Sequence, residues 1–306
     1  MGGPAQEETD QPTSRLPFEG VSRGSMDIPE LLCGYPDQWE AFRSRHLTFL
    51  ERLPNLKAAL DLALCRSFTS TCPADRLIFT MGHLCAEDFW EVGLLCANGY
   101  GVGALKLLRS FYEVAVTMAY LSKNPSEVDD FLDYHWVSQH KLVKAIEDSF
   151  GAGRFGRDIF GQTKEEYARV KDNFRVPICK KCGTPRMNHN WNKLDMVSMA
   201  KKTRFGADII PGYYEPMMQA HSTVHAIISR FSKTTDDLIK FDQGAQPEQA
   251  DRALMTAHRL ILGVLVTHEE FFRLKTLELP LQTCRKDFLD TWRKENPDDP
   301  SEIYAS

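Results

Sequence analysis

An arginine and a glutamate stand four residues apart inside an otherwise apolar helical segment. Residues 103–121 follow the period of a helix, and about two thirds of their positions carry Leu, Val, Ala, Phe, Tyr or Met. Residues four apart share a helix face, so Arg109 and Glu113 can form an ion pair. A lone buried charge is very costly. Two interpretations follow: an inward-facing polar site, or an ion pair that only fixes helix packing.

A second polar cluster is the run His-Ser-Thr-Val-His at residues 221–225. His221 and His225 are one helical turn apart and can share a metal ion, but the metalloprotease motif needs a Glu where this chain has Ser222. Histidine exchanges protons near neutral pH, so His225 is a candidate general acid–base. The structural alternative places one histidine at the surface and the other in the core.

Two cysteines in the run Cys-Lys-Lys-Cys-Gly have the spacing of half a zinc knuckle. We expect Cys179 and Cys182 to be ligands and His189 to be a third, which makes Zn²⁺ the candidate cofactor. The alternative is a pair of surface thiols without a metal, because no second Cys-x-x-Cys occurs. The fourth ligand would come from elsewhere in the chain: Cys284, His221 or His225.

The elements that position these residues are predicted to be helices. The chain has 306 residues, of which 42% are apolar and 26% charged, a balance that supports a globular core. No alternating segment is long enough for a sheet, so we predict an all-α bundle of about six long helices, with an irregular Cys-containing insertion at 151–192. The long helices are expected near 37–68, 75–97, 103–121, 126–150, 213–238 and 249–277.

The ends of the chain differ from this helical domain, which we place at 36–280. Residues 1–35 have no apolar periodicity and predict a disordered arm, and residues 281–306 predict a tail with a short helix near 287–294. No signal peptide is recognised, which favours the cytoplasm. The most apolar run, 260–266, is too short for a membrane span, so no membrane association is expected. The formal net charge of -5 argues against a nucleic-acid surface over the whole chain.

Arg and His are also spaced by a few residues in two helical segments, Arg76 to His83 and Arg252 to His258. This spacing resembles the pattern of helical nucleases of the HEPN superfamily, in which such a pair faces RNA in a dimer cleft. The resemblance implies proton transfer by the imidazole and charge stabilisation by the guanidinium. At Ala253 this chain departs from that superfamily, which usually has a polar residue there.

A longer resemblance begins at residues 104–120, ALKLLRSFYEVAVTMAY, and continues with Phe-Leu-Asp-Tyr at 131–134. The chain resembles a bacterial helical family known only as a domain of unknown function, whose members then have a Tyr-rich segment and a Ser-x-x-Val-His element. Here Tyr-Tyr at 213–214 and Ser-Thr-Val-His at 222–225 occur in that order. The resemblance spans about 75–235 and implies an all-helical fold, with a distant HEPN-like relation by analogy.

In this family, the resemblance makes Arg109, Glu113 and His225 the candidates for a shared catalytic site. One hypothesis is a metal-independent ribonuclease in phage defence or a toxin system, with RNA as the partner and a homodimer or other homo-oligomer as the assembly. A second is a non-catalytic binding or sensing module. A third is a bundle that binds a small molecule near the polar pair. The binding candidates are Tyr112, Tyr134, Ser222 and His221.

Overall fold

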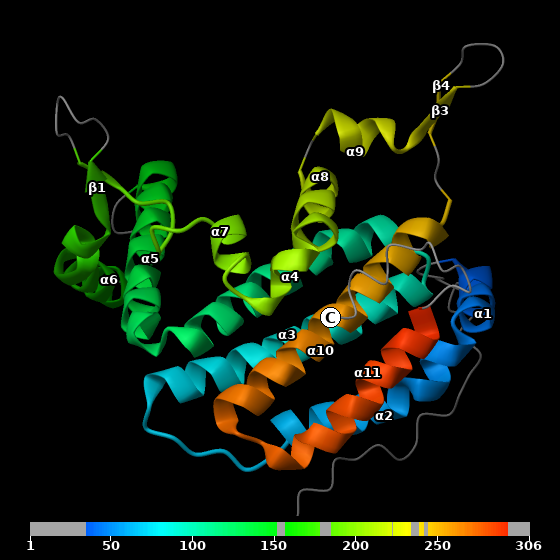
Figure 1. Ribbon diagram of the computed structural model, residues 1–306. Coiled ribbons are helices and arrows are strands. Elements are labelled where there is room, and N and C mark those ends of the chain that lie inside the picture. Colours follow the sequence, from blue (N-terminus) through cyan, green and yellow to red (C-terminus); the bar gives the residue numbers. More distant parts are fainter. Residues whose placement is uncertain are drawn as a thin grey trace, which may run out of the picture. The chain divides into compact units, whose positions relative to one another are not determined.

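The computed structural model describes residues 35–151, 157–177, 185–221, 223–233, 239–241 and 244–292. Every described residue belongs to one compact unit, Gly34–Ser306. The described residues form eleven α-helices and two small two-stranded sheets, so the all-α prediction is confirmed (Figure 1). Almost all of the predicted arm at 1–35 lies outside the described residues. In the described part of the chain, no helix has the length and apolarity that a membrane crossing requires.

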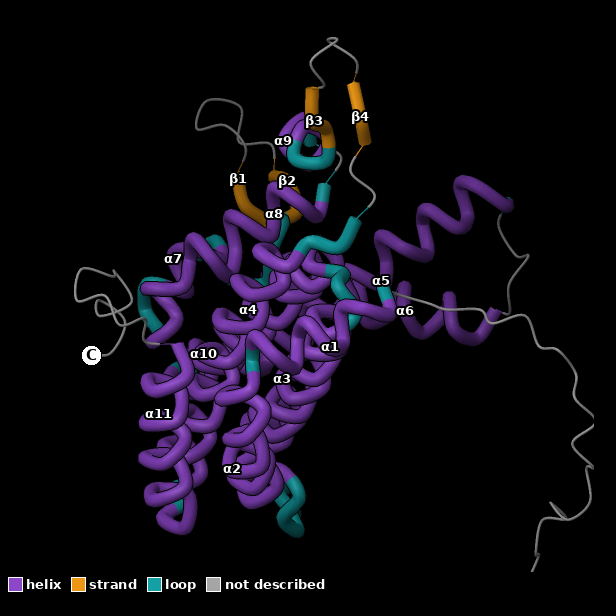
Figure 2. Tube along the Cα trace, turned by 90° about the vertical axis from the view of Figure 1, so that its right-hand side faces the viewer, coloured by secondary structure: helices purple, strands orange, loops and turns teal. Residues whose placement is uncertain are grey.

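Three long helices pack against one another and form the main core (Figures 1 and 2). The turn between the first two depends on Gly99, whose φ of 79° is in the left-handed region that glycine tolerates. Gly101 then lets the next helix begin against the backbone of Gln246, where a Cβ would overlap the carbonyl oxygen. The three helices are α3 (Pro73–Ala97), α4 (Gly101–Lys123) and α10 (Pro247–Phe272).

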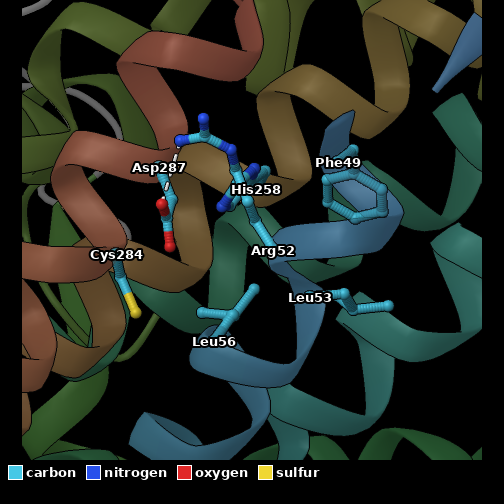
Figure 3. A pocket seen from close by; sticks show the side chains of 7 residues that line it. All are labelled: Phe49, Arg52, Leu53, Leu56, His258, Cys284 and Asp287. Atoms are coloured by element: carbon cyan, nitrogen blue, oxygen red, sulfur yellow. Dashed lines mark hydrogen bonds and ion pairs between the residues drawn. The ribbon is translucent and has the colours of Figure 1, made fainter. Parts of the chain in front are cut away.

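A second layer joins an early helix to the last one. Arg52 Nη1 donates to Asp287 Oδ1 at 2.9 Å (Figure 3). Asn55 Nδ2 donates to Asp287 Oδ2 at 2.8 Å. Trp292 Nε1 donates to Nδ1 of the buried His258 at 3.0 Å and links this layer to α10. The last helix begins at Glu278, well before the short helix expected at 287–294. The helices are α1 (Pro36–Arg45), α2 (Leu47–Leu64) and α11 (Glu278–Trp292), with a 3₁₀ turn, η5 (Lys275–Leu277), before α11.

A helical hairpin and its following strands carry a small core of their own. Val137, Val170 and Phe174 are buried together, and the rings of His140 and Tyr167 stack with centroids 3.8 Å apart. These contacts hold much of the segment that was predicted to be irregular. Its elements are η1 (Pro125–Glu127), α5 (Val128–Phe150), α6 (Arg157–Val170), η2 (Lys171–Phe174), β1 (Arg175–Pro177), β2 (Pro185–Met187) and α7 (Met196–Ala200).

The helix expected at 213–238 is broken into several elements. The chain leaves the helical path at His221, and the Thr223 hydroxyl accepts from Ala226 N at 3.1 Å, which caps a new short helix. Farther on, the aromatic residues Phe231 and Phe241 pair across a hairpin, as aromatic side chains favour. The elements are η3 (Arg204–Asp208), the π-helix η4 (Ile209–Tyr214), α8 (Glu215–Ala220), α9 (Val224–Ile228), β3 (Phe231–Lys233) and β4 (Ile239–Phe241).

Candidate functional site

Arg109 on α4 forms hydrogen bonds with Glu113 on the same helix and with His221, which is distant in sequence. Its Nε donates to Glu113 Oε1 at 2.9 Å, one turn along the same helix. Its Nη1 lies 2.7 Å from Nε2 of His221, which follows directly after α8. The spacing of Arg109 and Glu113 thus forms an ion pair, and an imidazole from 112 residues away completes a polar triad.

The contact between Arg109 and His221 fixes the proton arrangement on the imidazole. A guanidinium carries five N–H donors and no acceptor. Nε2 of His221 must therefore accept from Arg109, which places the ring proton of the neutral imidazole on Nδ1. Among the described residues these two contacts occupy two of the five guanidinium N–H donors, and the other three can hold an anionic ligand.

Aromatic residues support the guanidinium from the π-helix side. The Arg109 guanidinium carbon lies 5.1 Å from the centre of the Tyr213 ring, a cation–π distance. Tyr213 in turn packs on Tyr112, with ring centroids 6.2 Å apart. Tyr112 is fully buried and donates from its hydroxyl to Phe205 O at 2.9 Å, and burial raises the pKa of this phenol. The binding candidate Tyr112 is therefore a packing residue beneath the triad.

The π-helix that carries Tyr213 is anchored at two points. Asp208, at its start, forms an ion pair with Arg259 of α10 and is almost completely buried. Burial raises the pKa of the Asp208 carboxyl, and Arg259 opposes that rise. At the other end, Gly212 lies so close to Tyr112 that a Cβ there would overlap the ring. A wide helical turn at this place is in keeping with the frequent occurrence of π-helical turns at functional sites.

The triad lies at the surface of α4 and is reached by solvent. The side chains of Arg109 and Glu113 are 22% and 38% exposed, and His221 is exposed. The segment had been expected to be buried all round, but Lys106 and Ser110 are also exposed and give α4 a narrow solvent face. Because the polar groups share this face, they form an open site rather than an interior ion pair.

Other predicted site residues lie elsewhere or outside the described residues. His225 is exposed on α9, beyond the break that follows α8, and the described contacts of Arg109 are made with His221 instead. Tyr134 on α5 donates to Asn188 O at 3.0 Å, in a different part of the fold. Ser222 lies outside the described residues.

The structure describes only one of the three expected zinc ligands. His189 is exposed in the loop after β2, whereas Cys179 and Cys182 lie outside the described residues. Among the residues that are described, no group of three or more His, Cys, Asp and Glu side chains is arranged to hold a metal ion. The zinc site at these residues stays a prediction.

In the two loosely spaced Arg and His pairs, each side chain has a different partner among the described residues. Arg252 is exposed and pairs with Glu215 at 2.8 Å, whereas His258 is only 3% exposed and burial lowers its pKa to about 3. Arg76 donates from Nε to Ser70 O at 2.6 Å, and His83 packs edge-on against a phenylalanine ring. Each pair lies on one helix, as the spacing predicts, and a joint role of either pair stays a prediction.

The comparison with known families gives one match, described as "Family of unknown function (DUF5677)", over residues 85–239. This range is just over half of the 306 residues. The chain belongs to the DUF5677 family. The DUF5677 range contains Arg109, Glu113, Tyr213 and His221, so the complete triad and its aromatic support lie within it. The resemblance to an uncharacterised helical family is thereby confirmed. No curated protein and no solved structure matches the chain.

Proposed function

We propose that this protein is a metal-independent ribonuclease of the HEPN type, with Arg109 and His221 at its catalytic centre. The observation that carries the proposal is the 2.7 Å contact between a guanidinium and a neutral imidazole on an accessible face. Arginine binds phosphate oxygens through paired N–H groups, and histidine transfers protons near neutral pH. Together they supply two of the functions that phosphodiester cleavage needs.

In the proposed reaction the RNA supplies its own nucleophile. Arg109 Nη1 turns from His221 to the bound phosphate, which frees the lone pair of His221 Nε2. Nε2 then takes the proton of a ribose 2′-hydroxyl, and the 2′-oxygen forms a bond to phosphorus. The remaining N–H groups of Arg109 stabilise the negative charge that develops on the phosphate oxygens. The bond from phosphorus to the 5′-oxygen then breaks, and the leaving oxygen takes up the proton held by His221. The products are a 2′,3′-cyclic phosphate and a 5′-hydroxyl end.

Glu113 and Tyr213 are positioning residues in this scheme. Glu113 holds Nε of Arg109 at 2.9 Å, which leaves the Nη groups directed toward His221 and solvent. Tyr213 supports the guanidinium plane from one side. Both contacts reduce the conformational freedom that Arg109 would otherwise lose when it binds phosphate.

The remaining expectations fit this proposal but do not carry it. A homodimer, a cytoplasmic location, a role in phage defence or a toxin system, and a zinc ion at Cys179 and Cys182 stay predictions. The net charge of -5 gives little long-range attraction for RNA. We therefore expect short contacts around the cleaved phosphate rather than an extended basic track.

Cleavage of a labelled RNA by the purified protein in EDTA tests the proposal. We expect His221→Ala to lower the rate by about 10²-fold or more, the usual contribution of a general acid–base group. His225→Ala is the matched control, because His225 is an exposed histidine four residues away. Equal rates in wild type and His221→Ala would remove His221 from the mechanism. The absence of cleavage by folded wild-type protein would instead favour the non-catalytic binding module or the ligand-binding bundle.

A further inference from the structure

A cavity separate from the candidate site lies where α5 begins, beside β1 and the loop that follows β2. Its volume is about 350 Å³, in the range of small-molecule sites. None of its lining residues belongs to the Arg109–His221 triad, so it is independent of the proposed function. Its charged lining residues are Glu127, Asp130, Arg175 and Lys193, and its aromatic ones are Phe174 and Trp191.

Hydrogen bonds form this cavity before any ligand enters. Glu127 accepts from the Tyr120 hydroxyl at 3.0 Å and from the side-chain amide of Asn192. Asn188 Nδ2 donates to Asn192 O at 3.0 Å, and the hydroxyl of Tyr134 donates to Asn188 O at 3.0 Å. These bonds tie the loop to α4 and α5, so little conformational entropy remains to be lost on binding.

The charged residues of the cavity are of both signs. Glu127 and Asp130 stand three residues apart at the start of α5, on one helix face. Lys193 and Arg175 come from the loop and from β1. Within the described part of the chain, Asp130 and Lys193 have no hydrogen-bond or ion-pair partner, although Arg175 pairs with Asp172 at 3.1 Å. A cavity with two carboxylates and two cationic groups suits a ligand that carries both charges.

Apolar side chains complete the lining. Phe174 and Trp191 are 4% and 9% exposed, and both are held by neighbouring aromatic rings. They offer a small apolar surface next to the charged groups. We propose that this cavity binds a zwitterion of the size of a free amino acid. The ammonium group would face Glu127 and Asp130, and the carboxylate would face Lys193.

Titration of the full chain with each of the twenty common amino acids, by isothermal calorimetry, tests this proposal. We expect saturable binding of at least one amino acid, with one site per chain. Asp130→Asn and Lys193→Met should each weaken that binding by roughly tenfold, because each removes a charge-assisted hydrogen bond. Both side chains are exposed, so the variants should fold, which their thermal melting verifies.

Two matched controls separate this site from general charge effects. Asp129→Asn and Lys201→Met remove exposed charges that do not line the cavity, and they should bind as the wild type does. The proposal is overturned if no amino acid binds saturably. It is equally overturned if the cavity variants bind as tightly as the wild type, or if the controls lose as much affinity as the cavity variants.

Discussion

Replacing Gly212 by alanine should destabilise the protein, because the new Cβ meets the ring of Tyr112, on which Tyr213 packs. A Cβ at this position overlaps Tyr112, which is fully buried and has no free space to move into. Overpacking of this kind costs about 1–3 kcal/mol. If the ring shifts enough to lose its hydrogen bond to Phe205 O, about 1 kcal/mol is added. We therefore expect a loss of about 1–4 kcal/mol in the free energy of unfolding.

Gly93 provides the matched control for this substitution. It lies inside α3, and a Cβ there would meet no atom within 4 Å. Alanine at this helical position should stabilise the protein by about 0.5–1 kcal/mol, because it restricts the unfolded chain. Gly212→Ala and Gly93→Ala are the same chemical change with opposite expected signs, so their difference isolates the packing against Tyr112.

Urea denaturation followed by far-ultraviolet circular dichroism measures both variants. One kcal/mol corresponds to roughly 2–4 °C in melting temperature for a domain of this size, so thermal melting gives a second reading. Gly212→Ala should also slow RNA cleavage, because Tyr213 is the next residue and lies against Arg109. If Gly212→Ala is as stable as Gly93→Ala, the close packing of the π-helix on Tyr112 is refuted.

Two further predictions concern the second layer. Burial lowers the pKa of His258 to about 3, so the unfolded chain, with a histidine pKa of about 6.5, binds the proton more readily. The free energy of unfolding should therefore fall as the pH drops from about 6.5 toward 3. In the His258→Gln variant the urea midpoint should fall less steeply with pH, and an unchanged dependence of the midpoint on pH would contradict this. Asp287→Ala should lower the urea midpoint more than Asp290→Ala, because the Asp287 side chain is 13% exposed against 42% for Asp290 and accepts from both Arg52 and Asn55. Equal midpoints would show that the less exposed carboxylate contributes nothing extra.

Local periodicity predicts the long helices well but not the segment after Arg204. Helices expected at 75–97 and 249–277 correspond closely to α3 and α10, because their apolar spacing decides which face is buried. The long helix expected here begins only at residue 213, whereas the π-helix begins at Ile209. Its form depends on contacts with Tyr112 and Arg259, which are distant in sequence. Spacing alone does not contain that information.

In the candidate site, helix spacing predicts the contact between Arg109 and Glu113 but not the contact between Arg109 and His221. Arg109 and Glu113 meet because a four-residue spacing on a helix brings them together. The sequence favoured His225 as the catalytic histidine and His221 as a binding residue, and a continuous helix would put both on one face. The break after α8 and the cap at Thr223 separate them, and His221 is the one that contacts Arg109. The sequence signal for the break is Thr223, because threonine is favoured at the N-cap of a helix over the helix interior.

The π-helix has an angular consequence for the guanidinium. A π-turn holds about one residue more than an α-turn, and each α-helical residue rotates the chain by roughly 100°. The wider turn of Ile209–Tyr214 accommodates this additional residue, and Tyr213 is one of the residues that the turn carries. From this turn the Tyr213 ring meets the Arg109 guanidinium, with 5.1 Å between the guanidinium carbon and the ring centre. A one-residue deletion inside Ile209–Tyr214 therefore removes the cation–π contact unless Tyr213 keeps its position against Arg109.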